Sequence, residues 1–391
     1  MKRFIPMKRI IRKKKDKPLG LVDLVGLGVG GTIGSGIFVV PAVAAGMTGP
    51  SSLLAWLLCV ISFGAVLGCL TVLARKYAVT GAFYSIFEKS FSAPVATATI
   101  ALYIISGVLG VATIAAAIGD IVKIDGVPPV ALEAGLVVGF GLLNLIGIAL
   151  AARIEDFLTV IKILPLLVIP ILLFPFISAD NFLPMSTHGM DFLKSAVVIY
   201  WCFTGFELSA IPSKAVRDPE HTVPRSLIYV FVAVTVIYLA LNFALIGSVG
   251  TDALASTMTP ISYAVDHFFS GWGVVVAFVA IVSMLSALNA YLLGTSLVME
   301  SFSAKYWRPL TFERKGIPVF TVIICTIATV ILLFVTRDFS LLASASVIAT
   351  LVPYLALCYA ALKYIERPLV KVMAIIGILS TGIVLVSSFL L

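Results

Sequence analysis

The chain has 391 residues, of which 61% are apolar and only 12% are Asp, Glu, Lys or Arg, with a formal net charge of +8. A soluble globular protein usually has about twice that charged fraction, and so few charges would leave large apolar patches in water. The composition therefore excludes a soluble enzyme. A mean hydropathy of +1.14 instead predicts membrane-spanning helices of about 20 residues each.

Apolar stretches between charged and turn-forming clusters predict the membrane crossings in chain order. We expect eleven helices, near 21–46, 50–76, 93–120, 128–151, 157–178, 192–213, 224–249, 271–300, 317–336, 339–363 and 368–390. The fold class is thus an all-α polytopic membrane protein with about 11 transmembrane helices. The very short connections at residues 47–50 and near Arg337 predict that the helices they join are antiparallel neighbours.

The basic residues indicate how the chain is oriented. With the amino terminus in the cytoplasm, 23 of the 27 lysines and arginines fall in inner segments, nine of them before residue 18. Only Lys123, Lys194 and Arg337 are outside, and Lys162 lies within a span. Short cytoplasmic loops are enriched in basic residues, so the excess is a topology signal and predicts no nucleic-acid partner. The first span is expected to be an uncleaved signal anchor.

The five cysteines and three histidines predict no metal site. All the cysteines lie inside apolar stretches, where a free cysteine packs as a small apolar residue. The histidines fall in different loops without ligand spacing. We therefore expect no disulfide, no metal and no cofactor.

The segment GLGVGGTIGSGIF at 26–38 contains the dinucleotide pattern G-x-G-x-x-G, but no strand precedes it and it lies within a span, so a dinucleotide site is rejected. Gly26 and Gly30 have the spacing of close helix packing. Gly34, Ser35 and Gly36 are not explained in that way. Consecutive flexible residues there predict that the helix unwinds in mid-membrane, which is tolerated where the segment lines a cavity.

An unwound segment offers binding groups of both polarities. The N–H groups that start the following half-helix attract an anion, and the carbonyls that end the preceding half attract a cation. A zwitterion such as an α-amino acid fits this break without any ionised side chain.

A second break is predicted in the sixth span, YWCFTGFELS at 200–209, where Thr204 and Gly205 precede the intramembrane Glu207. Because it comes five helices after the first break, the two helices enter from opposite sides, as an inverted repeat of five helices requires. An acid in a span by default marks function or pairing. The alternative for Glu207, and also for Lys162 in the fifth span, is snorkelling to the membrane surface.

Four segments are similar to the amino acid–polyamine–organocation (APC) transporters, over about residues 19–363. They are Gly-x-x-Ile-Gly-Ser-Gly-Ile-Phe at 30–38, Phe-Thr-Gly-Phe-Glu at 203–207, VRDPEHTVPRS at 216–226 and SALNAYLLGTSLV at 286–298. The resemblance implies paired, inverted five-helix repeats with helices 1 and 6 broken, and secondary transport of amino acids. The domains expected are a basic cytoplasmic tail (1–20), a first repeat (21–178), a second, inverted repeat (192–363) and an additional terminal helix (368–391).

By the same resemblance, N–H groups of Gly34, Ser35 and Gly36 bind the substrate carboxylate, and carbonyls of Thr32, Trp201 and Thr204 take its ammonium. Trp201 and Phe203 gate the pocket, while Tyr103, Ser106 and Asn289 line it. The candidate substrate-binding residues are Thr32, Ile33, Gly34, Ser35, Gly36, Tyr103, Ser106, Trp201, Phe203, Thr204, Gly205, Glu207 and Asn289.

In proton-coupled relatives a lysine in span five occupies the place that a sodium ion takes in the wider fold, and Lys162 stands in a matching position. A lysine taken out of water releases its proton readily. The resemblance thus implies a proton as coupling ion, with Ser283 and Ser286 as hydrogen-bond partners of Lys162. Two departures from the family are the missing twelfth span, which leaves the oligomeric state open, and Leu297–Glu300 where an arginine is often found.

We expect a multi-pass plasma-membrane protein with a cytoplasmic amino terminus that takes up small neutral or apolar amino acids by proton-coupled alternating access. One alternative is an exchanger of amino acids or polyamines with a cationic substrate. A membrane-embedded enzyme would need several converging acids, nucleophiles or metal ligands, and the spans hold only Lys162 and Glu207 as ionised groups.

Overall fold

The computed structural model describes residues 20–76, 82–146, 148–185, 192–207, 216, 218–306, 313–314 and 317–390. Its main helices are α1 (Leu21–Thr32), α2 (Ser35–Thr48), α3 (Ser52–Lys76), α5 (Ala93–Ile121), α6 (Pro129–Ile146), α7 (Ile148–Leu173), α8 (Leu193–Trp201), α9 (Pro219–Val249), α12 (Gly273–Tyr306), α13 (Val319–Val335), α14 (Phe339–Tyr364) and α15 (Pro368–Ser387). Short helices are α4 (Ala82–Ser90), α10 (Thr251–Ala255), α11 (Pro260–Phe268), η1 (Gly49–Ser51), η2 (Phe174–Phe176), η3 (Ala179–Phe182) and η7 (Ser388–Leu390). Strands β1 (Glu313–Arg314) and β2 (Ile317–Pro318) form an antiparallel pair.

Each of the eleven predicted ranges overlaps at least one of these helices, and the first overlaps both α1 and α2, which confirms the all-α class. The predicted basic tail lies outside the described residues. The expected start of the fifth span, residue 157, is wrong because α7 already begins at Ile148. Charged residues end a membrane span, but a helix can continue past it. α4, α10 and α11 lie between the expected ranges, where no helix is predicted.

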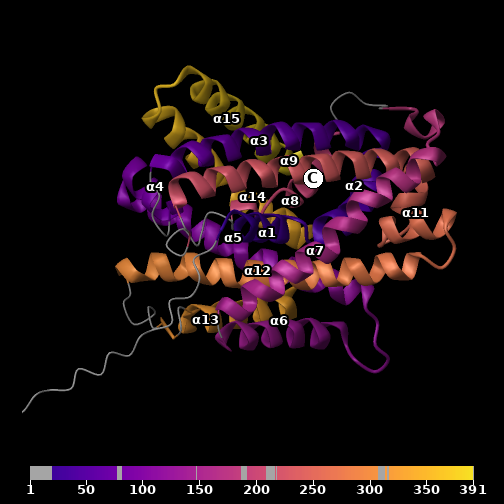
Figure 1. Cartoon of the computed structure of the whole chain (residues 1–391), viewed down its shortest axis with the longest axis horizontal. Coiled ribbons are helices and arrows are strands. Elements are labelled where there is room, and N and C mark those ends of the chain that lie inside the picture. Colours follow the sequence, from indigo (N-terminus) through magenta and orange to yellow (C-terminus); the bar gives the residue numbers. More distant parts are fainter. Residues whose placement is uncertain are drawn as a thin grey trace, which may run out of the picture.

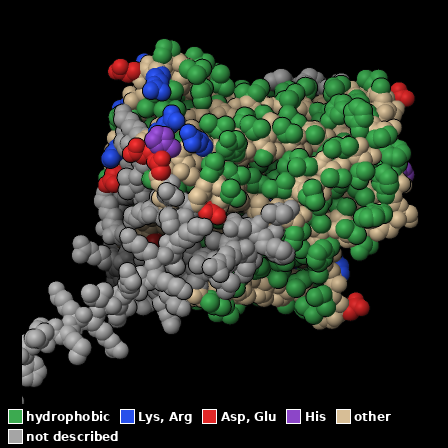
Figure 2. Space-filling view, in the orientation of Figure 1, with side chains coloured by type: hydrophobic (Ala, Val, Ile, Leu, Met, Phe, Trp, Pro, Cys, Tyr) green, Lys and Arg blue, Asp and Glu red, His purple; other side chains and the backbone are tan. Residues whose placement is uncertain are grey.

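The long helices lie side by side along the longest axis of the molecule (Figure 1). In the described part of the chain, seven helical segments are long and apolar enough to cross a membrane, one of which comprises α1, α2 and α3. Apolar side chains cover the middle of the face in Figure 2, and charged side chains gather toward the two ends. Such an apolar band with charged ends is what a bilayer requires, so the chain is a multi-pass membrane protein.

The broken first helix lies at the centre of this bundle. α1 packs against α7, α9 and α12, and α2 packs against α8 and α10. α2 and α3 contact each other, and their antiparallel arrangement stays a prediction. α13 and α14 do not pack along each other in the described residues, so that expectation is wrong. Both pack on α5, and α13 also packs on α6 and α12.

An ion pair fastens the loop between α13 and α14 to the ends of α5 and α6. Arg337 Nε donates to the two carboxylate oxygens of Glu133 at 2.9 and 2.8 Å, and its Nη2 also donates to Oε1. Asp120 lies 3.8 Å from the same guanidinium. Glu133 is fully buried against Gly119, where any side chain would collide with its carboxylate. The pair explains why this short loop rests on α5 and α6.

Candidate functional site

The first helix breaks at Ile33 and Gly34, between the end of α1 at Thr32 and the start of α2 at Ser35. The Gly34 N–H bonds to the Thr32 carbonyl, so it does not continue the helical ladder. The break thus falls where the glycine pattern predicts one, but it is shorter than expected. Ser35 and Gly36 already belong to the first turn of α2. We call Thr32–Gly36 the junction.

Three side chains from other helices donate hydrogen bonds to the carbonyls at the end of α1. Lys162 of α7 donates from Nζ to the Gly30 carbonyl at 2.6 Å. Tyr238 of α9 donates to the Thr32 carbonyl at 3.0 Å, and Ser283 of α12 donates to the Ile33 carbonyl at 3.1 Å. The break leaves these carbonyls without helical partners, and an unpaired carbonyl in a membrane is costly. The carbonyl side of the junction is therefore satisfied by the protein.

The amino end of α2 is different, because no side chain caps it. The first turn of a helix presents N–H groups without intrahelical partners and a partial positive charge. At this turn Trp201 donates from Nε1 to Ser35 Oγ at 3.2 Å, which fixes the hydroxyl but leaves the N–H groups to a ligand. This end of the junction is suited to a carboxylate.

Two glycines of the junction are required for close packing. A Cβ at Gly34 would lie 2.6 Å from Ala287 Cβ on α12, and a Cβ at Gly36 would lie 2.8 Å from Cys202 Sγ after α8. The junction therefore touches both the eighth predicted span and the second break. Any larger residue would push these elements apart.

The second break follows directly after α8. The helix ends at Trp201, and Gly205 has a φ of +97°, a conformation that L side chains rarely adopt. A Cβ at Gly205 would also lie 2.9 Å from the Gly31 carbonyl oxygen. The two predicted breaks thus lie against each other, although about 170 residues separate them in the sequence.

Glu207 follows this turn and is held by three donors. Tyr103 of α5 donates to Oε1 at 2.9 Å, Tyr354 of α14 donates to Oε2 at 3.0 Å, and the Gly205 N–H donates to Oε2 at 3.2 Å. The side chain is 3% exposed, so the snorkelling alternative is wrong. A buried carboxylate needs such partners to offset the loss of water. Glu207 therefore ties α5 and α14 to the second break.

Lys162 is the other ionisable group of the spans, and it is 0% exposed. Its Nζ also donates to Ser286 Oγ of α12 at 2.8 Å, so its snorkelling alternative is wrong as well. Lys162 connects three helices at the carbonyl end of α1. The predicted partner Ser286 contacts Lys162 directly, whereas the predicted partner Ser283 bonds to the neighbouring Ile33 carbonyl.

The remaining candidate residues are spread more widely. Phe203 packs edge-on against Trp56 and Tyr238 at 5.8 and 5.3 Å between ring centroids, as part of a cluster of aromatic rings beside the junction. Ser106 donates to the Tyr103 carbonyl and accepts, through its own carbonyl, a bond from Ser346 of α14.

Asn289 on α12 is 1% exposed, and its side-chain oxygen has no hydrogen-bond partner among the described residues. Such an orphaned acceptor is uncommon in a folded protein. The side-chain oxygen of Asn289, a predicted lining residue, can therefore still accept a hydrogen bond from a ligand.

Sequence reasoning missed Tyr238, Tyr291 and Tyr354. Tyr291 OH lies 2.7 Å from Thr204 Oγ1, and its ring lies 5.7 Å from that of Trp201. A tyrosine within a membrane span must place its hydroxyl on a partner. Tyrosines in otherwise apolar spans were therefore the signal that could have found these three.

The junction is closed to solvent in this conformation. Thr32 is 3% exposed and Trp201 is 4% exposed. Cavities of about 530 and 290 Å³ lie elsewhere, between α11 and α12 and beside Arg337. Within the described ranges no group of three His, Cys, Asp or Glu side chains could hold a metal ion. The arrangement is an occluded site built from backbone groups, two ionisable side chains and aromatic hydroxyls.

The sequence of the chain is also similar to one known protein family. Residues 19–391 match the sequence model of the amino acid permease family. An uncharacterized protein of Methanocaldococcus jannaschii is 25% identical over 317 residues, which cover 77% of this chain and 72% of that protein. The branched-chain amino acid permease BcaP of Bacillus subtilis is 24% identical over 324 residues, 74% of this chain and 68% of that protein. The uncharacterized amino acid permease YvbW of Bacillus subtilis is 24% identical over 323 residues, 77% and 72% of the two chains.

Proposed function

The chain belongs to the amino acid permease family, and from this premise we propose that it takes up small neutral or apolar amino acids together with a proton. The family and the permease relatives make the chain an amino acid transporter and not an enzyme. The proposed mechanism is alternating access in the plasma membrane, with the amino terminus in the cytoplasm and two inverted repeats, 21–178 and 192–363, moving around the junction.

The asymmetry of the junction carries this proposal. The carbonyl end of α1 is occupied by Lys162, Tyr238 and Ser283, whereas the amino end of α2 has no side-chain cap. The substrate carboxylate binds the N–H groups of Ser35 and Gly36, where it completes the first turn of α2 and meets the positive end of its dipole.

The substrate ammonium binds carbonyls of Thr32, Trp201 and Thr204. The Thr32 carbonyl already accepts bonds from Tyr238 and the Gly34 N–H, and the Trp201 carbonyl accepts two from Thr204. A carbonyl oxygen has two lone pairs. Ammonium binding therefore displaces the Tyr238 or Thr204 hydroxyl, and this exchange couples substrate binding to movement of α8 and α9.

The substrate is neutral because neither buried charge is open to its side chain. Glu207 accepts three hydrogen bonds, and Lys162 donates to Gly30 and Ser286. Gly34 and Gly36 pack tightly against Ala287 and Cys202, which favours a substrate with a small side chain. The name of the Bacillus subtilis relative, a branched-chain amino acid permease, agrees with an apolar substrate.

Lys162 carries the coupling proton. In its charged form it holds the end of α1 against α7 and α12 through Gly30 and Ser286. Loss of the proton removes the positive charge and weakens both bonds, since hydrogen bonds from charged donors are about twice as strong as neutral ones. The α1 end is then released from α7, which changes the access of the junction.

Uptake into proteoliposomes tests this function. We expect saturable accumulation of labelled alanine, valine or leucine when the outside is more acidic than the inside, and little accumulation without the gradient. Arginine and putrescine serve as cationic controls. Uptake that depends on internal amino acid and not on pH would establish exchange instead, and no uptake of any of these compounds would contradict the proposal.

A further inference from the structure

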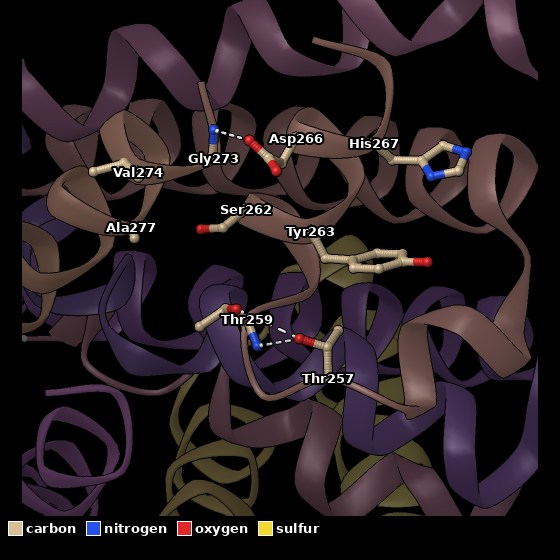
Figure 3. A pocket seen from close by; sticks show the side chains of 9 residues that line it. All are labelled: Thr257, Thr259, Ser262, Tyr263, Asp266, His267, Gly273, Val274 and Ala277. Atoms are coloured by element: carbon tan, nitrogen blue, oxygen red, sulfur yellow. Dashed lines mark hydrogen bonds between the residues drawn. The ribbon is translucent and has the colours of Figure 1, made fainter. Parts of the chain in front are cut away.

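A cavity of about 530 Å³ lies between α11 and the first turns of α12, away from the junction and the second break (Figure 3). Thr259, Ser262 and Asp266 line it from one side. Their spacing of three and four residues places the last two on one face of α11, with Thr259 at its N-cap. Gly273, Val274 and Ala277 of α12 line the other side.

The carboxylate of Asp266 is held in a fixed position at this cavity. Its Oδ1 accepts the N–H groups of Gly271 at 2.9 Å and Gly273 at 3.1 Å, and Figure 3 shows the second bond. A Cβ at Gly273 would lie 2.7 Å from Asp266 Cβ, so only glycine lets the two elements approach here. Asp266 is exposed, and its Oδ2 has no hydrogen-bond partner in the described part of the chain.

A second, independent observation also points to a ligand. Ser262 is only 9% exposed, lines the cavity, and its hydroxyl has no hydrogen-bond partner within the described ranges. The hydroxyl oxygen itself is not enclosed, so a donor in the cavity can reach it. The cavity thus presents an unpartnered hydroxyl one helical turn from a carboxylate oxygen.

The rest of the lining favours a positively charged ligand. It contains the hydroxyls of Thr257 and Thr259 and no lysine or arginine. The ring of Tyr263 stacks on His267 at 6.1 Å between centroids, while Val274 and Ala277 form an apolar wall. Acceptors around one carboxylate match a group with three N–H donors and a positive charge.

We propose that this cavity binds a primary ammonium group, held by Asp266 and Ser262, as a site separate from the substrate junction. Its source is either the ethanolamine headgroup of a phospholipid or a free amine. Trp272, Val274 and Phe278 beside the cavity are 62%, 76% and 63% exposed. In a membrane protein such side chains face lipid, and tryptophan gathers at the membrane interface. A headgroup therefore reaches the cavity as readily as a solute.

Calorimetric titration of the purified full chain with ethanolamine tests the free amine. We expect saturable binding that Asp266→Asn weakens about tenfold or more, as for the loss of a charge-assisted hydrogen bond. Asparagine keeps the oxygen that accepts from Gly271 and Gly273. Asp252→Asn, on the exposed side of α10, should bind as the unchanged chain does, and choline, which has no N–H donor, should bind more weakly.

The lipid source is tested in nanodiscs that contain phosphatidylethanolamine or phosphatidylcholine. A melting temperature raised by phosphatidylethanolamine, and not raised in Asp266→Asn, supports a headgroup in the site. Should Asp266→Asn fail to fold, Ala277→Leu fills the cavity without altering the acid and should abolish the same binding. If ethanolamine and phosphatidylethanolamine act equally on the unchanged chain and on the folded variants, or act on neither, the proposal is overturned.

Discussion

The ammonium of Lys162 lies 2.6 Å from the carbonyl oxygen of Gly30, three residues before the break in the first helix. In an unbroken helix this carbonyl would accept the N–H of Gly34. That N–H instead bonds to the Thr32 carbonyl, so the break and the lysine contact depend on each other. A buried charge on α7 thereby holds the end of α1.

Lys162→Ala should lose gradient-driven accumulation and retain substrate binding. The substitution removes the titratable group but leaves the N–H groups of α2 intact. The measurement is pH-driven uptake beside equilibrium binding of the same labelled amino acid. Lys371→Ala, at an exposed position, is the matched control and should transport normally. Coupling that persists in Lys162→Ala would show that the lysine has only a structural role.

Gly34→Ala should abolish transport, because its Cβ would lie 2.6 Å from Ala287 Cβ and force the junction away from α12. The double variant with Ala287→Gly removes the second methyl and should recover part of the uptake. Gly139→Ala, where nothing lies within 4 Å, should be neutral. Normal uptake by Gly34→Ala alone would mean that the junction does not pack in this way.

Tyr103→Phe and Tyr354→Phe should each lower stability by about 1–2 kcal/mol, since each removes one donor to the buried Glu207. The melting temperature of the solubilised protein should fall by a few degrees in each case. Because both hydroxyls serve one carboxylate, their effects should not add in the double variant. Tyr359→Phe, at an exposed tyrosine, is the control. Additive or absent effects would contradict the shared network.

Arg337→Ala should destabilise the protein by about 3–5 kcal/mol, because it leaves the fully buried Glu133 without its partner. Replacing the pair by Arg337→Met and Glu133→Leu should restore much of this loss. Thermal unfolding measures both. A single variant as stable as the unchanged chain would mean that the loop is not held by this pair.

The hydrogen bonds to Glu133 raise the pKa of Arg337. The arginine contribution to stability is therefore fully present below the ordinary pKa of an arginine, and it is lost only as the pH rises through the higher pKa of the folded state. The difference between Arg337→Ala and the unchanged chain should accordingly keep its size when the pH is raised from about 7 to about 9.

Most of the fold follows from hydropathy and charge. The features that were not predicted are those on which these two signals carry no information. Long apolar stretches predicted where the main helices lie, since a bilayer requires about 20 apolar residues. The start of α7 at Ile148 was missed because charged residues mark the membrane surface and not the end of a helix. α4, α10 and α11 were missed because helices this short have no such length requirement.

The candidate site was predictable at positions where the backbone conformation or a close contact requires glycine. Gly34 and Gly205 stand where the chain breaks and where the two breaks touch, and both are marked by glycine in a span. The partners of Glu207 were not predictable, because Tyr103 and Tyr354 come from helices far apart in the sequence. Only three-dimensional packing shows that their hydroxyls converge on one carboxylate, or that Phe203 faces Trp56.

Proton movement during transport tests the central claim most directly. A pH-sensitive dye is trapped inside proteoliposomes that contain the protein, with no pH gradient and with the membrane potential clamped at zero. Addition of an outside substrate such as valine should acidify the interior of vesicles that contain the unchanged chain and leave the interior of Lys162→Ala vesicles unchanged. Substrate entry without any acidification would contradict proton coupling through Lys162.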